Sequence, residues 1–251
     1  FIDVYNAADG ELGSRDLVAV GRAVLHLGRE NPELFQDALR AFAEASQADR
    51  TWAEPHIRLG QLFLDKYDSP SAKEEVQKAL LQNPRDPDAL IVMARAYDFD
   101  GSPQTEPVLD SLLAVNPRYV DALVLQAMRR LSADGNETAL AIADAALEVN
   151  PNSLGALPAL EGAHVLDDDA VPFREAREQA LTLNPAYAQL DIELAELSVR
   201  ARRYALAVDR AQAAVALDSM AWEAWGLLGM NQLRVGRIEE GRASLERAFA
   251  G

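Results

Sequence analysis

The residues that could carry out chemistry are few and lie far apart along the chain. The 251-residue sequence has no cysteine and only three histidines, His26, His56 and His164. No His-Glu-x-x-His motif occurs, so we expect no zinc peptidase centre in this segment. A Gly-x-Ser-x-Gly elbow, a phosphate-binding loop and a dinucleotide fingerprint are also missing from the sequence. We therefore predict no catalytic residue, no metal ligand and no cofactor.

Two short acidic stretches, residues 98–101 and 167–169, invite comparison with a calcium site. An EF-hand loop needs about five oxygen positions within twelve residues and a closing glutamate. Neither stretch supplies that order, so we interpret both as turn and helix-cap residues. Asn136 opens a formal glycosylation sequon, but an asparagine there also suits a helix N-cap, which is the interpretation that we favour.

The charge of the chain limits its partners. The sequence has 40 acidic and 24 basic residues, which gives a formal net charge of -16. Such a surface repels the phosphate backbone of a nucleic acid and favours basic or neutral ligands. No run approaches the ~20 apolar residues that a membrane-spanning helix needs.

One short motif recurs along the chain and marks where its helices are expected to end. Asn-Pro occurs at residues 83, 116, 150 and 184, and Asp49 and Asp218 fill the same place one period earlier and later. The successive steps are 34, 33, 34, 34 and 34 residues. A period of 34 with a proline-marked stop is typical of helix–turn–helix repeats. We therefore predict an all-α solenoid of about seven antiparallel helix pairs.

Helical periodicity and turn residues give the expected bounds of these helices. Pro70 and Pro103 suit the first position of a second helix, because a missing N–H costs nothing there. The first helices are expected at 16–28, 53–66, 87–98, 119–132, 153–166, 187–200 and 221–235, and the second helices at 33–47, 70–82, 104–115, 137–149, 170–183, 204–217 and 238–250.

Small residues recur at matching places in these helices. Five of the second helices share one pattern, as in Ala139-x3-Ala143-x2-Ala146. The pattern begins with a small residue, has a second core residue four positions later, and ends with an alanine three positions after that. The first helices carry the pattern Leu59-Gly60 and Leu228-Gly229. Because residues three and four apart share a helix face, these small side chains let a neighbouring backbone come close.

This arrangement closely resembles the tetratricopeptide repeat, whose consensus has W-x2-L-G-x2-Y in the first helix, then A-x3-F and a closing proline. The resemblance covers nearly the whole chain, so residues 1–251 are expected to form one array, with residues 1–14 the remnant of a preceding repeat. It implies a right-handed α-solenoid that acts as a protein–protein interaction scaffold, with no catalysis in this segment. The repeat that begins at Pro87 departs from the family pattern by being one residue short.

In this family, side chains of the first helices line a concave groove that binds a peptide or protein segment. Members that dock chaperone tails hold a peptide carboxylate with Lys and Asn, but the matching places here are Ile, Val, Gln and Met. The resemblance therefore implies a partner segment with apolar and basic residues. The groove candidates are Ile57, Gln61, Ile91, Arg95, Val124, Met128, Ile192, Glu196 and Met230, with Glu54, Asp88, Asp121, Gln189 and Glu223 on the same faces.

A cluster of large side chains, Met220, Trp222, Trp225 and Met230, allows two interpretations. Trp222 and Trp225 could form an aromatic anchor for a partner. Alternatively, Trp225 is the core tryptophan of the consensus and Trp222 covers a neighbouring seam.

A more distant resemblance suggests another role. Residues 16–23, 34–38 and 62–67 are similar, in that order, to the N-terminal helical part of large bacterial proteins with a gluzincin-type metallopeptidase domain. This implies a regulatory or substrate-guiding part of a larger enzyme, whereas a purely structural spacer is a third interpretation. A soluble location in the bacterial cytoplasm or the periplasm would suit the chain. Because both ends look like cuts through a longer array, we also expect end-to-end self-association.

Overall fold

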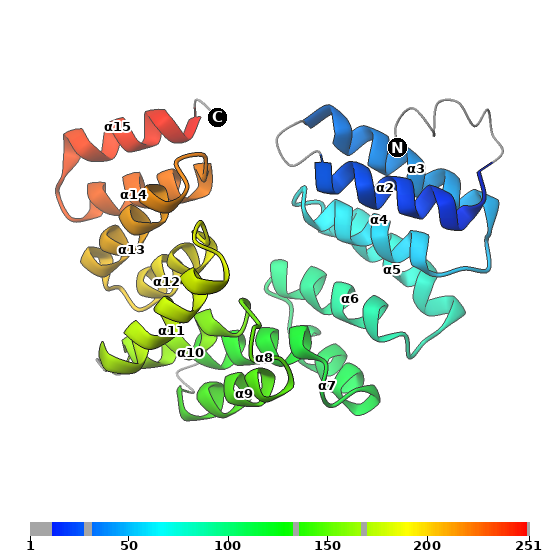
Figure 1. The fold of residues 1–251 in the computed structure, drawn as a ribbon, viewed down its shortest axis with the longest axis horizontal. Helices are drawn as coiled ribbons and strands as arrows, with labels where there is room; N and C mark the ends of the chain where they lie inside the picture. The colour runs from blue at the N-terminus through cyan, green and yellow to red at the C-terminus, as the bar shows by residue number, and fades with distance from the viewer. Residues whose placement is uncertain (1–11, 28–31, 133–135, 167–169, 250–251) are drawn as a thin grey trace. The chain divides into compact units, whose positions relative to one another are not determined.

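The structure is a computed structural model that describes residues 12–27, 32–132, 136–166 and 170–249. These residues form fourteen α-helices and no β-strand, which confirms the predicted all-α class. The chain divides into two compact units, Phe1–Pro117 and Arg118–Gly251. Within each unit the helices follow one another as antiparallel neighbours (Figure 1). Residues 1–11 of the expected repeat remnant at 1–14 lie outside the described part of the chain, and Ser14 already belongs to α2.

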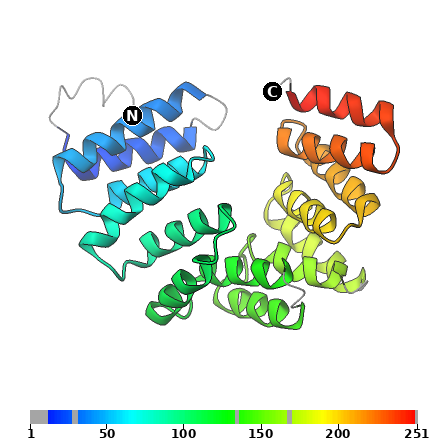
Figure 2. The same cartoon turned by 180° about the vertical axis from the view of Figure 1, so that it is seen from behind.

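The fourteen helices form seven consecutive pairs, as the period predicts. In both views, α2 and α3 lie side by side, and α14 lies beside α15 (Figure 2). Unit 1 contains α2 (Ser14–Leu27), α3 (Pro32–Ala48), α4 (Glu54–Leu64), α5 (Ser69–Gln82), α6 (Pro87–Phe99) and α7 (Thr105–Val115). Unit 2 contains α8 (Val120–Ser132), α9 (Asn136–Val149), α10 (Leu157–Leu166), α11 (Ala170–Leu183), α12 (Gln189–Arg200), α13 (Tyr204–Leu217), α14 (Trp222–Arg234) and α15 (Ile238–Phe249).

The recurring Asn or Asp ends a helix by the same hydrogen bond in five repeats. Its Oδ1 atom accepts the backbone N–H of the residue two positions later, at 2.8–3.2 Å, at Asp49, Asn83, Asn150, Asn184 and Asp218. Such Asx turns compete with helical hydrogen bonding and stop the helix. The intervening residue donates no bond in this turn, so proline is tolerated there.

The turns inside four of the pairs share a left-handed residue. Tyr67, Gly101, Arg202 and Gly236 have φ between 58° and 85°. The next residue donates its N–H to the carbonyl five positions earlier, at 2.8–2.9 Å in each case. This is the Schellman C-cap, in which glycine is the usual residue because it lacks a Cβ. Tyr67 and Arg202 adopt the same conformation without glycine.

Small residues fill the seam between the helices of a pair. Gly229 on α14 lies so close to α15 that an added Cβ would sit 2.8 Å from the Gly241 carbonyl oxygen and 2.9 Å from the Leu245 nitrogen. The predicted small-residue faces are therefore real contact faces. The alanines with no exposed surface include Ala38, Ala45, Ala72, Ala79, Ala139, Ala143, Ala146, Ala207, Ala211 and Ala214.

Each unit has its own apolar core. In unit 1, Phe42 is fully buried between α2, α3 and α4. In unit 2, Leu157 and Leu194 belong to a core shared by α8, α9, α10, α11 and α12, and Val208 belongs to a second core shared by α12, α13 and α14. The helix pairs are therefore held by a continuous series of neighbour contacts within each unit, as in other repeat proteins.

The helix starts lie within two residues of the prediction except at α10, and Pro103 does not take the first helical position expected for it. Helix α10 was expected from residue 153 but begins at Leu157, because Pro158 has no N–H to donate to Leu154. Helix α7 begins at Thr105, so Pro103 precedes it instead of opening it. The missing residue of this short repeat falls here, since α7 has 11 residues and α5 has 14. Pro70 is the second residue of α5, whose N-cap is Asp68.

Candidate ligand-binding pocket

A hollow of about 390 Å³ lies in unit 2 at the N-terminal ends of α12 and α14. These are the first helices of two consecutive pairs, and they contact each other. Binding pockets for small groups commonly have volumes of about 300–1,000 Å³. The pocket is lined by Ala186, Tyr187, Ala188, Gln189, Ile192, Asp218, Ala221, Trp222 and Glu223.

The Asx turns described above place the walls of this pocket. One turn, at Asn184, leads through Tyr187 into α12, and the equivalent turn at Asp218 leads through Ala221 into α14. Because the two turns are one repeat apart, they bring Tyr187 and Trp222 to the same hollow. The phenolic O–H of Tyr187 donates to the carbonyl of Leu154 at 3.3 Å, which fixes the ring.

The described lining of the pocket carries two carboxylates, of Asp218 and Glu223, and no basic side chain. Asp218 uses one oxygen to accept the N–H of Met220 at 2.8 Å. Glu223 is exposed at the first turn of α14. The chemistry of the hollow is therefore that of aromatic and apolar walls with an acidic rim.

More carboxylates lie beside the pocket on α12. Glu193 is partly buried and accepts a hydrogen bond from Nε2 of Gln189 at 3.3 Å. Burial, and then the negative charges of Glu196 and Glu223, raise the pKa of Glu193 to about 7. Burial also raises the pKa of Glu196, although Arg200 lies 3.5 Å from its carboxylate and opposes this shift. These carboxylates therefore create a negative potential next to the hollow.

The face of α14 next to Glu223 has unoccupied space at Gly226. A Cβ added to Gly226 would meet no atom within 4 Å. Because Glu223, Gly226 and Met230 are three and four residues apart, they lie on one face of the helix. Met230 is also exposed on this face. The packing of the chain explains Gly229 but gives no reason for Gly226.

The predicted groove residues differ in how much surface they present. Ile57, Ile91 and Ile192 are at most 4% exposed, so their main role is in packing the first helices against neighbouring helices. Gln61, Val124, Met128 and Glu196 are partly buried, whereas Arg95 and Met230 are exposed. Of the nine candidates, the pocket includes Ile192, and it adds Gln189 and Glu223 from the same predicted faces. Use of these residues by a peptide stays a prediction.

The two tryptophans of the predicted anchor have different surroundings. Trp222 lines the pocket. Trp225 donates its indole N–H to the carbonyl of Ser219 at 3.1 Å and packs on the second core of unit 2. The guanidinium of Arg247 lies 4.7 Å from the Trp225 ring centre. Trp225 thus has the contacts of a core tryptophan, and Trp222 alone faces the hollow.

Sequence reasoning missed Tyr187 and Asp218. The groove pattern covers positions inside the first helices, but these two residues belong to the turns before α12 and α14. Aromatic residues at this place of the turn, Tyr119 and Tyr187, recur two repeats apart and offered a signal.

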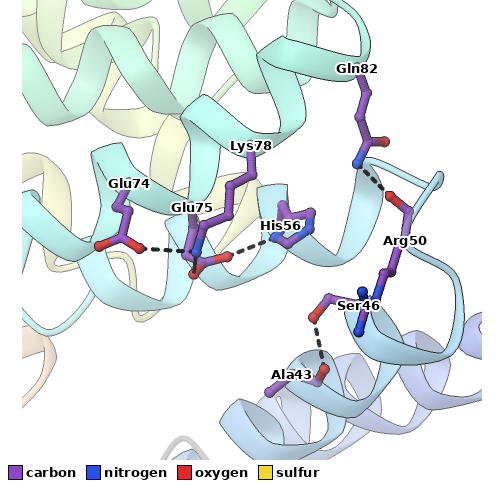
Figure 3. A network of polar contacts seen from close by, with 8 residues as sticks. All are labelled: Ala43, Ser46, Arg50, His56, Glu74, Glu75, Lys78 and Gln82. Carbon is purple, nitrogen blue, oxygen red and sulfur yellow. Dashed lines mark hydrogen bonds and ion pairs between the residues drawn. The ribbon is translucent and has the colours of Figure 1, made fainter.

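The histidines do not gather into a site in the described residues. His56 on α4 pairs through Nδ1 with Oε2 of Glu75 on α5 at 2.7 Å, and Lys78 contacts the same carboxylate at 2.7 Å (Figure 3). This network joins the two helices of one pair. His26 is exposed, and the side chain of His164 lies outside the described residues.

The described part of the chain contains no group of three or more His, Asp or Glu side chains that could hold a metal ion. Among the described helices, none combines the length and the apolar character that crossing a bilayer requires.

Antiparallel helix pairs, a 34-residue period and small residues in the seams define a helical-repeat solenoid. Within that class, the fold is that of the tetratricopeptide repeat. A tetratricopeptide repeat protein from Parabacteroides merdae is similar, with a TM-score of 0.61 and 18% identity over 94% of this chain and 92% of that one. The expected family fold is thus confirmed.

Two other solved structures share this fold. Cut9-Hcn1, an APC/C hetero-tetramer, gives a TM-score of 0.64 at 13% identity and covers 94% of this chain, which spans only 50% of that one. The structure of pilF from Pseudomonas aeruginosa gives a TM-score of 0.54 at 18% identity, over 79% of this chain and 92% of that one. No protein-family model and no curated protein matches the sequence.

Proposed function

We propose that this chain is a protein-interaction module that binds a segment of a partner protein along the first helices of unit 2. The observation that carries this proposal is the pocket between the N-terminal ends of α12 and α14. It continues into the α14 face of Glu223, Gly226 and Met230, where the chain leaves open surface. A helical-repeat solenoid commonly uses such a surface for recognition and carries no chemistry of its own.

The partner segment is expected to be apolar and basic. The chain has a net charge of -16, and Glu196 and Glu223 stand on the proposed surface. Opposite charges across an interface steer encounter and suppress wrong partners, and this effect weakens as salt screens it. Binding should therefore weaken as the ionic strength rises.

An array of extended fifteen-residue peptides, varied systematically in charge and apolar content, tests this function. We expect the chain to retain peptides with basic and apolar residues and to ignore acidic ones. Met230→Asp should weaken retention, because it places a charge at an exposed apolar position on the proposed surface. Leu81→Asp is the matched control, since Leu81 is also exposed but belongs to α5 in unit 1. Equal retention of acidic and basic peptides would contradict the proposal.

The second candidate, a substrate-guiding part of a larger metallopeptidase, stays a prediction from the resemblance at residues 16–23, 34–38 and 62–67. It requires a His-Glu-x-x-His motif and a further glutamate ligand in the same reading frame as this segment. Sequencing the parent gene on both sides of the segment checks this. A parent reading frame without such a motif would remove the candidate.

Self-association is proposed to use α15. Ile238 and Phe249 on this helix are exposed, the latter by 87%. Burying such side chains against a second copy would remove apolar surface from water. Light scattering at rising protein concentration should show an increasing average mass, and Phe249→Ser should reduce it. A constant monomer mass for the unaltered chain would rule out this contact.

A further inference from the structure

We infer that the pocket between α12 and α14 is a subsite for one cationic side chain, an arginine or a lysine, of the bound segment. This inference rests on the proposed function, because it says which residue of the partner the first-helix surface selects. It goes further by assigning the recognition to Trp222, Tyr187 and Glu223. Four features of the described residues carry it: the pocket lining, the charge beside it, the open glycine and the fixed position of one ring.

The lining suits a cation better than a neutral or acidic group. Two aromatic residues, Tyr187 and Trp222, contribute to the walls, and the carboxylates of Asp218 and Glu223 complete them. An aromatic face attracts an ammonium or guanidinium group through its ring quadrupole. A carboxylate nearby adds a charge-assisted hydrogen bond. An acidic side chain would instead meet two like charges and no basic partner within the described lining.

The apolar lining suits the stem of such a side chain. Lysine and arginine carry three or four methylene groups below the charged head, and these bury well against apolar surface. Ala186, Ala188, Ala221 and Ile192 supply that surface. With a volume of about 390 Å³, the hollow has room for one long side chain.

The three carboxylates beside the pocket, of Glu193, Glu196 and Glu223, outnumber the basic group that lies by them, Arg200. Glu193, Glu196 and Glu223 influence one another strongly enough to raise the pKa of Glu193, with burial as the largest cause. Arg200 is the basic group that opposes this effect, and it lies by Glu196. A cation in the hollow would reduce the repulsion among these carboxylates. Binding should therefore be tighter at pH 8, where Glu193 is ionised, than at pH 6.

Gly226 shows where the backbone of the partner would pass. A glycine inside a helix makes the helix less stable than an alanine would, and the surrounding chain gives no steric reason for a glycine at position 226. Its open face lies one turn from Glu223, so a partner backbone could approach α14 closely there while its side chain enters the pocket. Gly226→Ala should then weaken the binding of a peptide but leave the binding of an isolated side chain unchanged.

The inference can be tested on the intact chain with small probes. N-acetyl-arginine methylamide and N-acetyl-lysine methylamide carry the proposed side chains, and the citrulline and norleucine analogues are their neutral counterparts. The ¹⁵N-labelled indole of Trp222, assigned with Trp222→Phe, reports occupancy of the pocket. We expect the cationic probes to shift this resonance with at least about threefold higher affinity than their neutral counterparts.

Two substitutions and one control sharpen this test. Glu223→Gln should lower the affinity of the cationic probes about three- to tenfold, because it removes a charge but keeps the shape. Trp222→Leu should lower the affinity of the cationic probes by a similar factor, whereas Trp222→Phe should retain part of that affinity. Because both variants lack the Trp222 indole, the ring resonances of Tyr187 report binding in them. Glu148→Gln on α9 is the matched control, since Glu148 is exposed and lies outside the lining. Equal affinity for arginine and citrulline probes, or no effect of Glu223→Gln, would overturn the inference.

The same variants separate this inference from the proposed function. If array peptides bind but their affinity does not change with Glu223→Gln or Trp222→Leu, the cationic subsite is wrong and the interaction function stands. If no peptide binds but the arginine probe binds in a Glu223-dependent way, the pocket stands and the peptide-binding function falls. Loss of both signals in the unaltered chain would refute both.

Discussion

Asp191 on α12 and Arg177 on α11 form an ion pair across the boundary between two consecutive helix pairs. Nη2 of Arg177 lies 3.0 Å from Oδ2 of Asp191, and the carboxylate is only 1% exposed. Its other oxygen, Oδ1, lies 3.3 Å from Nη1 of Arg210 on α13. One buried carboxylate thus joins three helices of unit 2. Because a buried charge is stable only when it is paired, the three side chains depend on one another.

Removing this carboxylate should destabilise unit 2. Asp191→Asn leaves two guanidinium groups near each other without their shared counter-charge, and we expect a loss of about 2–4 kcal/mol in the free energy of unfolding. Urea unfolding followed by circular dichroism measures the loss. Asp209→Asn on α13 is the matched control, because Asp209 is exposed, and it should change stability by less than about 0.5 kcal/mol. Equal effects of the two substitutions would contradict this view of the ion pairs.

Enlarging a seam alanine should overpack the contact between paired helices. Ala139 and Ala207 have no exposed surface, so phenylalanine at either position should cost about 1–3 kcal/mol. Thermal unfolding measures this as a lower Tm. Ala141→Phe on the same helix as Ala139 is the control, since Ala141 is exposed. An unchanged Tm for both seam variants would contradict the packing scheme.

Two glycines on α14 should respond in opposite directions to the same substitution. Gly229→Ala places a Cβ 2.8 Å from the Gly241 carbonyl oxygen and should cost about 1–3 kcal/mol. Gly226→Ala meets open space and should stabilise the helix by about 0.5–1 kcal/mol. Chemical unfolding of both variants checks this pair. A destabilising Gly226→Ala would mean that the chain itself packs on that face.

The stability contributed by Glu193 should fall as the pH rises. Its pKa is raised to about 7 in the folded chain, chiefly by burial, with Glu196 and Glu223 adding to the shift and Gln189 and Arg200 opposing it. The folded state therefore binds a proton more tightly than the unfolded state between about pH 4.5 and pH 7, and stability is lost over this range.

The variant Glu193→Gln isolates this effect. Glutamine cannot ionise, so the variant should be more stable than the unaltered chain by about 1–2 kcal/mol at pH 8 and nearly equal to it at pH 4.5. Thermal unfolding of both proteins at several pH values measures the difference. A difference that does not change with pH would show that Glu193 titrates normally. Glu178→Gln, at an exposed position of α11, serves as the control.

Much of the fold could be predicted because the same helix-ending residues recur in successive repeats. Asn83, Asn150 and Asn184 end their helices by the same local hydrogen bond, which depends on residues only two positions apart. Local chemistry of this kind is visible in the sequence, and repetition separates it from chance. The all-α class, the seven pairs and the buried alanine faces followed from it.

The features that the sequence did not predict depend on contacts between helices or on cooperative backbone geometry. Asp191, Arg177 and Arg210 come from three helices, and nothing local marks them as partners. The left-handed conformation of Tyr67 is imposed by the turn, because the usual glycine signal is missing there. Helix α10 begins later than the repeat pattern predicts, because Pro158 lacks the N–H that an earlier start would need.

The candidate pocket was predicted only in part, for a similar reason. Ile192 and Trp222 were recognised from their helical positions, but the pocket also needs the turns that carry Tyr187 and Asp218. A pattern of helix faces cannot show that two turns from consecutive repeats meet at one hollow.

The left-handed turn residues have a consequence for engineering. Arg202 and Gly236 have equivalent backbone conformations and lie 34 residues apart. A block cut between two such positions carries one complete second helix, the following Asx turn and one complete first helix. Duplicating residues 203–236 would therefore add a unit whose two joints reproduce a turn already present in the chain. The length of unit 2 is in this sense an adjustable variable, but the added hollow would have Ala221 and Gly226 where Tyr187 and Ile192 line the present pocket, so a tandem copy would lengthen the array without repeating the tyrosine wall.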